Sequence, residues 1–154
     1  MRLLLISVGK IRGKDMSTIV GEYEKRAARY WPLEVVEVRE ESARSRTAVE
    51  VKAREGERLL EAAGGALVVA CDERGTMLRS EEFAEWLRDE REKAVRDVAF
   101  VIGGAYGLSE EVLARAERRM ALSRFTLPHE LARLVLVEQL YRAGTILRGE
   151  PYHK

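Results

Sequence analysis

The sequence predicts a single-domain α/β protein with a mostly parallel sheet and helices on both faces. Short apolar runs typical of strands buried on both faces alternate with longer amphipathic segments of helical spacing. No repeat, low-complexity tract or linker-like stretch interrupts this alternation. With 154 residues, 46% of them hydrophobic, the chain can bury one sizeable core and is too short for two independent domains. We therefore expect residues 1–154 to form one domain.

The first half of the chain contains two expected strands and two expected helices. Leu3–Val8 is a continuous apolar run closed by Gly9, and Leu33–Val38 is a second short run rich in valine. Between them, Lys14–Tyr30 has apolar residues at helical spacing and stops before a proline. After a polar, charged loop, Ala48–Ala63 is rich in helix-forming residues and ends at paired glycines, which predicts a helix.

A third strand and a third helix follow. Ala66–Cys71 is an apolar run that we expect to end at the polar turn Asp72–Gly75. Ser80 is expected to cap the next helix, because its hydroxyl can accept a backbone N–H and two glutamates follow in the first turn. Phe83 and Leu87 lie on the apolar face of that helix.

The last part of the chain adds two expected strands and two expected helices. Asp97–Ile102 is a fourth strand that ends in paired glycines, and Met120–Leu122 is a short fifth strand. Ser109 stands where it can cap a short helix, and Pro128–Leu147 predicts the final long helix. Strands that alternate with helices in this way favour a parallel sheet.

The overall charge does not point to a nucleic-acid partner, because 27 basic side chains stand against 26 acidic ones. Their distribution is uneven. Met1–Glu111 carries 19 basic and 22 acidic residues, whereas Val112–Lys154 carries 8 and 4. A mildly basic C-terminal part is compatible with phosphate contacts and equally with ordinary surface charge.

The cysteine content and the start of the chain limit which compartment and which kinds of site are expected. Cys71 is the only cysteine, which excludes an internal disulfide framework and a cysteine zinc cluster. The apolar run at the start is too short for a signal-peptide core or a membrane span. We expect a soluble, cytoplasmic protein with no membrane segment and no bound metal.

Three strand ends carry the residues that could form a ligand site, because ligands of parallel sheets bind at the carboxyl ends of the strands. Cys71 and Asp72 form either part of such a site or a buried thiol and an ordinary turn. The run Gly103–Ser109 has paired glycines that let a ligand approach the backbone. The apolar loop Leu122–Pro128 either wraps an aromatic ligand or packs beneath another loop.

The glycine run matches neither common nucleotide-binding fingerprint. Its Gly-Gly-x-x-Gly spacing differs from the G-x-G-x-x-G of dinucleotide-binding folds, and no phosphate-loop lysine follows it. Taken alone, the run is either a ligand loop or a tight strand-to-helix turn.

Four motifs follow one another in the second half of the chain. They are VIGGAYGLS at Val101–Ser109, LSRFTLPHELAR at Leu122–Arg133, LVEQLYRA at Leu136–Ala143 and the terminal RGEPYHK. Together they resemble the ribosomal RNA large subunit methyltransferase H family, the small, single-domain branch of the SPOUT methyltransferases. The opening LLISVGK and EYEKR at Glu22–Arg26 are similar too, so the resemblance covers essentially the whole chain.

The resemblance implies S-adenosyl-L-methionine-dependent methylation of the N-3 nitrogen of a pseudouridine. The target lies in the helix 69 loop of 23S ribosomal RNA, on the large subunit or the assembled ribosome. The resemblance also implies a homodimer and a C-terminal trefoil knot that forms the cofactor pocket. Periodicity and composition do not predict a knot, because threading a chain through a loop is rare among folds.

The family pattern implies a cofactor pocket built from a strand end, the glycine run and the apolar loop: Cys71, Gly103, Leu122, Ser123, Arg124, Phe125, Thr126 and Leu127. Adenine is flat and edged with donors and acceptors, so backbone N–H and C=O groups between apolar side chains can bind it. Family members more often carry an aliphatic residue where this chain has Cys71. A small thiol preserves the apolar contact.

The family pattern places the Tyr-His-Lys tail over the cofactor of the partner subunit. We therefore expect His153 to handle the imide proton or contact the uracil, and Arg142 to contact phosphate or the anionic ring. Tyr152 is expected to stack on a base and Lys154 to contact the RNA. His129 is expected to be a helix-start residue that organises the knot loop. A neutral histidine, a carboxylate or a relayed water could accept the proton.

The final helix favours a dimer independently of the family. From Leu131 to Leu147 it is apolar on nearly every side, and such a helix needs burial all round. One face against the sheet and another against a second subunit would meet that need. Two copies would also gather more basic side chains for RNA, namely Lys10, Arg12, Lys14, Arg44, Arg46, Arg142 and Lys154.

Two alternatives from other classes remain at this stage. A non-catalytic RNA-binding or ribosome-binding dimer that retains the knotted fold would have no affinity for S-adenosyl-L-methionine. A nucleotide-binding enzyme of flavodoxin-like topology would use Gly103 and Gly104 for phosphate, which the spacing and the missing lysine disfavour.

Overall fold

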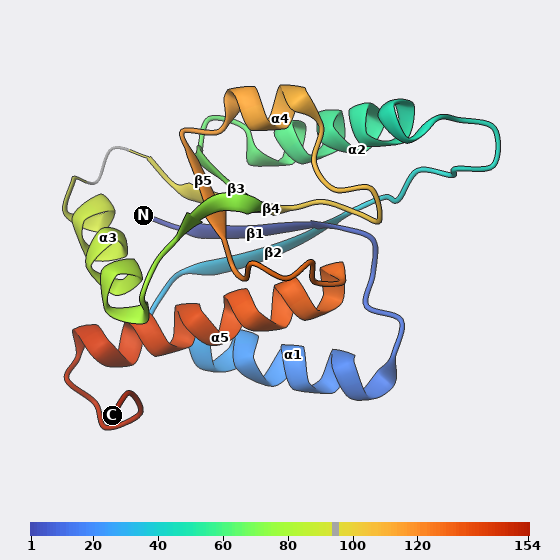
Figure 1. Ribbon diagram of the computed structural model, residues 1–154. Coiled ribbons are helices and arrows are strands. Elements are labelled where there is room, and N and C mark those ends of the chain that lie inside the picture. Colours follow the sequence, from blue (N-terminus) through green and yellow to red (C-terminus); the bar gives the residue numbers. More distant parts are fainter. Residues whose placement is uncertain (94–95) are drawn as a thin grey trace.

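The computed structural model describes residues 1–93 and 96–154, which form a five-stranded parallel sheet with helices on both faces (Figure 1). The strand order is β2-β1-β4-β3-β5. The strands are β1 (Leu3–Val8), β2 (Leu33–Val38), β3 (Leu67–Met77), β4 (Val98–Ile102) and β5 (Arg118–Ala121). The helices are α1 (Lys14–Ala27), α2 (Ala48–Ala63), α3 (Ser80–Lys93), α4 (Glu110–Arg115) and α5 (His129–Leu147).

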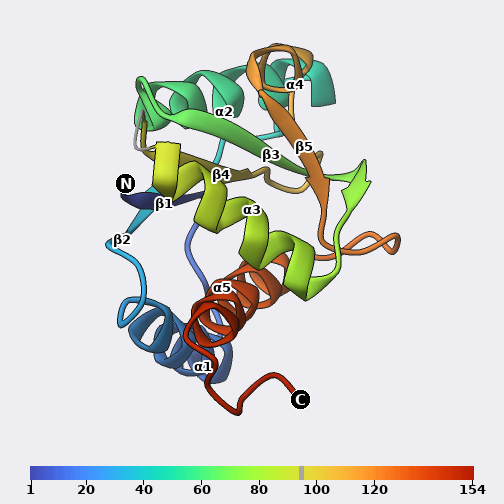
Figure 2. The ribbon, with the colours of Figure 1, turned by 90° about the vertical axis from the view of Figure 1, so that its left-hand side faces the viewer.

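Side chains of the central strands alternate between two hydrophobic cores, one on each face of the sheet. In β1, Leu3 and Leu5 pack in the core beneath α1, α3 and α5, whereas Leu4 and Ile6 pack in the core beneath α2 and α4. All six residues of β1 are buried, as expected for a strand covered on both faces. Figure 2 shows the two helical layers on opposite sides of the sheet.

The predicted fold class is confirmed, and β1, β2 and α2 have the predicted bounds. Helix α2 begins with a capping box. The Thr47 hydroxyl accepts the Glu50 N–H at 3.2 Å, and the Glu50 carboxylate accepts the Thr47 N–H at 2.7 Å. Ser109 caps α4 as predicted, because its hydroxyl accepts the Val112 N–H at 3.3 Å.

The predicted end of the third strand at Cys71 is wrong. Strand β3 continues to Met77, and Met120 of β5 lies opposite both Cys71 and Thr76. The intervening polar residues therefore form a bulge within a paired strand, not a closing turn. Gly75 makes this possible, because a Cβ there would come within 2.7 Å of the Met120 backbone nitrogen.

Several other bounds differ in detail, and β3, β4 and α5 each begin one residue later than predicted. Ser80 is the first residue of α3 and not its cap. The Arg79 N–H donates to the Glu82 carboxylate at 2.7 Å, while the Ser80 hydroxyl donates to the Gln139 side chain at 2.7 Å. Strand β5 lies earlier than the predicted Met120–Leu122, and α1 ends before its predicted C-terminus because a turn leads into the second strand.

Helix α5 packs between α1 and α3 on one face of the sheet (Figure 2). Its inner side buries Leu136 and Leu140 completely. On the same helix Arg133 is 6% exposed and donates to the carboxylates of Glu24 on α1 and Glu37 on β2, both at 2.7 Å. A buried guanidinium is costly without partners, so these carboxylates fix α5 against both elements. Neither α5 nor another helix of the described chain is long and apolar enough to cross a membrane.

Replacing Arg133 with methionine should lower the free energy of unfolding by about 3 kcal/mol, because two partly buried carboxylates lose their shared cation. Urea unfolding at fixed protein concentration measures the change. Arg148→Met, at an exposed position near the end of the same helix, is the control. An equal effect of the two substitutions would contradict the assigned role of Arg133.

Candidate cofactor pocket and C-terminal tail

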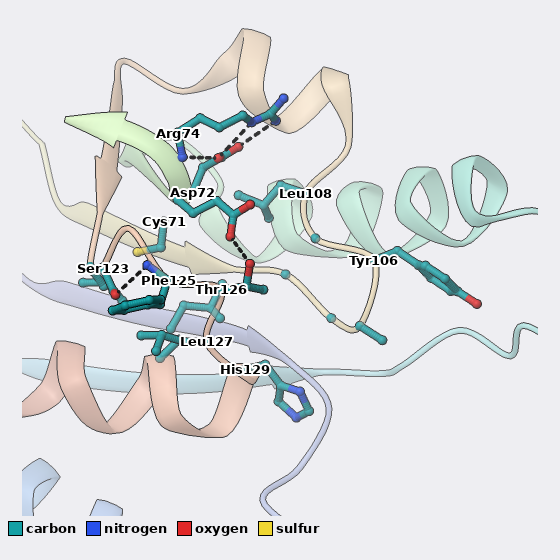
Figure 3. A pocket seen from close by; sticks show the side chains of 18 of the residues that line it. Cys71, Asp72, Arg74, Tyr106, Leu108, Ser123, Phe125, Thr126, Leu127 and His129 are labelled. Atoms are coloured by element: carbon teal, nitrogen blue, oxygen red, sulfur yellow. Dashed lines mark hydrogen bonds and ion pairs between the residues drawn. The ribbon is translucent and has the colours of Figure 1, made fainter. Parts of the chain in front are cut away.

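The largest group of predicted site residues surrounds a cavity of about 410 Å³ between the bulge of β3 and the carboxyl end of β4 (Figure 3). Seven of the eight predicted cofactor residues line this cavity: Cys71, Gly103, Leu122, Ser123, Phe125, Thr126 and Leu127. The start of α5 closes one side through His129 and Ala132. Three segments that are distant in the sequence therefore form one pocket, at the edge where ligands of parallel sheets bind.

The glycine loop, residues 103–107, is folded so tightly that its glycines are required. A Cβ at Gly103 would lie 2.6 Å from the carbonyl carbon of Gly107. The Gly107 N–H donates to the Gly104 carbonyl at 3.0 Å, and Gly107 has a φ of +83°, which favours glycine. The loop thus offers backbone rather than side chain to the pocket, as a site for a polar-edged ligand requires.

The apolar loop, residues 122–128, is fastened to the bulge of β3. The Arg124 guanidinium donates to the carbonyls of Glu73 at 3.3 Å and Gly75 at 3.2 Å. The Thr126 hydroxyl donates to the Glu73 carboxylate. Arg124, the eighth predicted cofactor residue, is therefore outside the lining and holds the loop from its outer side. Phe125 is 83% exposed and lies at the mouth of the pocket.

The charges of Asp72 and Arg74, in the bulge of β3, balance each other within the pocket wall. Arg74 donates to the Asp72 carboxylate at 3.2 and 3.0 Å, and these hydrogen bonds hold the pKa of Asp72 below its usual range. Burial raises the pKa of the Cys71 thiol to about 12, so the thiol is neutral at physiological pH. Cys71 therefore supplies an apolar contact and not a nucleophile.

Twelve lining residues were not among the predicted cofactor positions: Lys52, Asp72, Glu73, Arg74, Ile102, Gly104, Ala105, Tyr106, Gly107, Leu108, His129 and Ala132. Tyr106 and Leu108 belong to the glycine-rich run that the sequence indicates as a candidate loop. Lys52 lies on α2, where no local pattern distinguishes it from an ordinary surface lysine. In Figure 3 the Tyr106 side chain lies at the rim, on the side of the glycine loop away from Cys71 and Phe125.

The predicted catalytic and RNA-contacting residues gather at the other end of α5, near the C-terminus (Figure 1). Arg142 donates to the Glu138 carboxylate at 3.0 and 2.6 Å, and the Tyr152 hydroxyl donates to the same oxygen at 3.0 Å. The Arg142 guanidinium lies 4.7 Å from the centre of the Tyr152 ring. Arg142 is thus paired, as its place in an apolar helix predicts.

His153 joins this cluster through both ring nitrogens. Its Nδ1 lies 3.4 Å from Nη1 of Arg142, and its Nε2 lies 3.0 Å from the Glu81 carboxylate on α3. Burial, with hydrogen bonds to Tyr23 and Glu138, raises the pKa of Tyr152, so its hydroxyl remains a donor at neutral pH. Lys154 follows and is exposed.

The pocket and the tail lie too far apart to form one site within a single chain. Helix α5 has 19 residues and is therefore about 28 Å long, with His129 at the pocket and the tail beyond Leu147. Among the described residues, no group of three or more histidine, cysteine or carboxylate side chains is arranged to hold a metal ion.

Comparison with known proteins gives a consistent result over the whole chain. The family model described as "Predicted SPOUT methyltransferase" matches residues 1–153. Similar proteins named ribosomal RNA large subunit methyltransferase H occur in Gemmatimonas aurantiaca, 54% identical over 155 residues, and in Clostridium kluyveri, 40% identical over 159 residues. Both alignments cover 100% of each chain.

Solved structures support the same fold at lower identity. A probable methylase family protein from Haemophilus influenzae has a TM-score of 0.59 at 17% identity, with 99% of this chain and 70% of that chain covered. A probable methyltransferase from Bordetella pertussis has a TM-score of 0.58 at 17% identity, with coverages of 92% and 95%. The chain belongs to the SPOUT methyltransferase family and, within it, to the group of ribosomal RNA large subunit methyltransferase H.

Proposed function

We propose that this protein uses S-adenosyl-L-methionine to methylate the N-3 nitrogen of a pseudouridine in the helix 69 loop of 23S ribosomal RNA. The substrate would be the large ribosomal subunit or the assembled ribosome. The observation that carries the proposal is the gathering of seven family-predicted cofactor residues around one cavity. Full-length relatives named ribosomal RNA large subunit methyltransferase H support the choice of ribosomal RNA.

The pocket residues fit the methyl donor chemically. Leu122 and Leu127 offer apolar contact to a flat adenine, and the cavity of about 410 Å³ is of the size of small-molecule sites. The glycine loop and the apolar loop expose backbone groups that can recognise the edges of a base. When bound, the cofactor supplies a methyl group already activated by its positively charged sulfur. The protein then needs mainly to place the accepting nitrogen in line with it.

The tail residues fit the two remaining chemical demands. The imide nitrogen must lose a proton, and His153 has an imidazole already paired with a carboxylate at 3.0 Å, so it is our candidate to accept that proton. The Arg142 guanidinium beside it would stabilise the negative charge that develops on the ring. Tyr152 and Lys154 would contact the neighbouring RNA by stacking and by charge.

Joining the pocket to the tail requires a second copy of the chain, and we propose a homodimer. The two groups lie at opposite ends of α5, so a tail can meet a pocket only if it comes from a partner. Apolar side chains available for such an interface include Met77, which is 44% exposed, and the partly exposed Leu134 and Val135 on α5. The whole chain would act as one domain in the cytoplasm, and the trefoil knot remains a prediction.

Calorimetric titration with S-adenosyl-L-methionine tests the pocket. Gly103→Ala should weaken binding by at least about tenfold, because its Cβ would collide with the Gly107 backbone and displace the glycine loop. Gly65→Ala, where a Cβ would meet nothing within 4 Å, is the matched control and should bind as the unsubstituted protein does.

Methyl transfer to ribosomes that lack the modification, with mass spectrometry of the RNA fragments, tests the reaction itself. We expect one methyl group on the pseudouridine of the helix 69 loop. Absence of both binding and transfer would refute the enzyme and favour the non-catalytic RNA-binding dimer.

Deleting Tyr152–Lys154 should leave cofactor binding intact and abolish methyl transfer, because these residues lie outside the pocket of their own chain. Mixing this truncated chain with the Gly103→Ala chain should restore about a quarter of the normal activity, since half of the randomly formed dimers carry one complete site. Full activity of the truncated chain alone would contradict the role of the tail. Failure of the mixture to regain activity would contradict its action across subunits.

A further inference from the structure

Glu55, on the inner side of α2, is a buried carboxyl that the proposed reaction does not use. Glu55 is only 2% exposed. Oε1 accepts the backbone N–H of Glu41 at 3.0 Å, whereas no described residue donates to Oε2. A buried acceptor left without a donor is costly, so its retention calls for a physical explanation.

The unpartnered oxygen faces the glycine loop from behind. A Cβ at Gly104 would lie 2.8 Å from Oε2 of Glu55 and 3.1 Å from Cγ1 of Val8. Gly104 lines the cofactor pocket, while Glu55 itself does not. The carboxyl therefore lies against the backbone of the loop, outside the lining of the pocket.

The surroundings of Glu55 supply little compensating positive charge. Arg58, whose positive charge favours the ionised form of Glu55, already donates to the Glu41 carboxylate and to the Arg39 carbonyl. Glu40 and Glu41 add negative charge, and Val8 of β1 and Gly104 of the glycine loop, which carry no charge, lie beside the carboxyl. Burial, more than any other cause, raises the pKa of Glu55 above its usual range.

We propose that Glu55 is a positioning residue that holds the glycine loop and biases the pocket toward the cationic methyl donor over the neutral-sulfur product. The inference rests on the proposed function. Methyl transfer converts S-adenosyl-L-methionine into S-adenosyl-L-homocysteine and removes one positive charge from the sulfur. A carboxylate in a poorly solvated region acts over a longer range than one in water, so it favours the ligand that carries the extra charge.

Titration of both ligands into the full-length protein tests the bias. Glu55→Gln keeps the shape and the acceptor for the Glu41 N–H, so it should lower the preference for S-adenosyl-L-methionine over S-adenosyl-L-homocysteine about fivefold. The preference should rise with pH in the unsubstituted protein, as the carboxyl ionises, and stay flat in the variant. Glu57→Gln, the same change of charge at an exposed position on α2, should leave the preference unaltered.

Stability provides a second readout. A raised pKa in the folded state means that Glu55 contributes most favourably at low pH and loses this contribution as pH rises through the folded pKa. The difference between the thermal unfolding midpoint of Glu55→Gln and that of the unsubstituted protein should therefore increase, in favour of the variant, from pH 5 to pH 8. The proposed role predicts two results together: Glu55→Gln becomes relatively more stable as pH rises, and it discriminates less between the two ligands. A merely structural role would not change the ligand preference.

A size test addresses the contact with the loop. Gly104→Ala should weaken both ligands equally, and adding Glu55→Ala should restore part of the affinity by removing Oε2 from the path of the new Cβ. An unchanged ligand preference in Glu55→Gln, or equal losses for both ligands, would overturn the charge bias, and no recovery in the double variant would overturn the contact. If the unsubstituted protein bound neither ligand, the proposed function would fail instead.

Discussion

The length and fixed position of α5 constrain everything that the proposed site can do. The helix is held by completely buried leucines on one side and by the pairing of Arg133 with Glu24 and Glu37 on another. It therefore acts as a rigid spacer, with the pocket at its first residue and the tail beyond its last. Because a helix of 19 residues does not shorten without losing its hydrogen bonds, the two groups of functional side chains remain separated within each chain.

The glycine loop presents backbone to the pocket, and contacts outside the lining hold both loops of the pocket in place. Gly103 and Gly107 close the glycine loop by direct approach of main chain to main chain. Arg124 and Thr126 fasten the apolar loop to the bulge of β3. Such contacts hold the recognising backbone groups in place, while Asp72 and Arg74 balance each other's charge in the pocket wall.

Apolar runs and capping patterns were enough to predict the fold class and several bounds, because they are local properties of the chain. The predicted strand end at Cys71 failed because the polar residues 72–75 have a turn-like composition, whereas pairing with β5 decides their conformation. Arg133 and Glu55 look like ordinary helical residues, since their burial depends on partners distant in the sequence. The pocket positions followed from the family resemblance, and Arg124 showed that one loop can divide its residues between lining and support.

The wide separation of the pocket segments along the sequence, from the bulge of β3 to the start of α5, has a consequence for the synthesis of the protein. The pocket needs residues near 71, near 103 and near 125, so its walls meet only after most of the chain has left the ribosome. An unfinished chain that stops after β5 has the strands of the core but lacks the apolar loop and the helix start that close the cavity. Binding of a small ligand at this site consequently requires the chain as far as the start of α5.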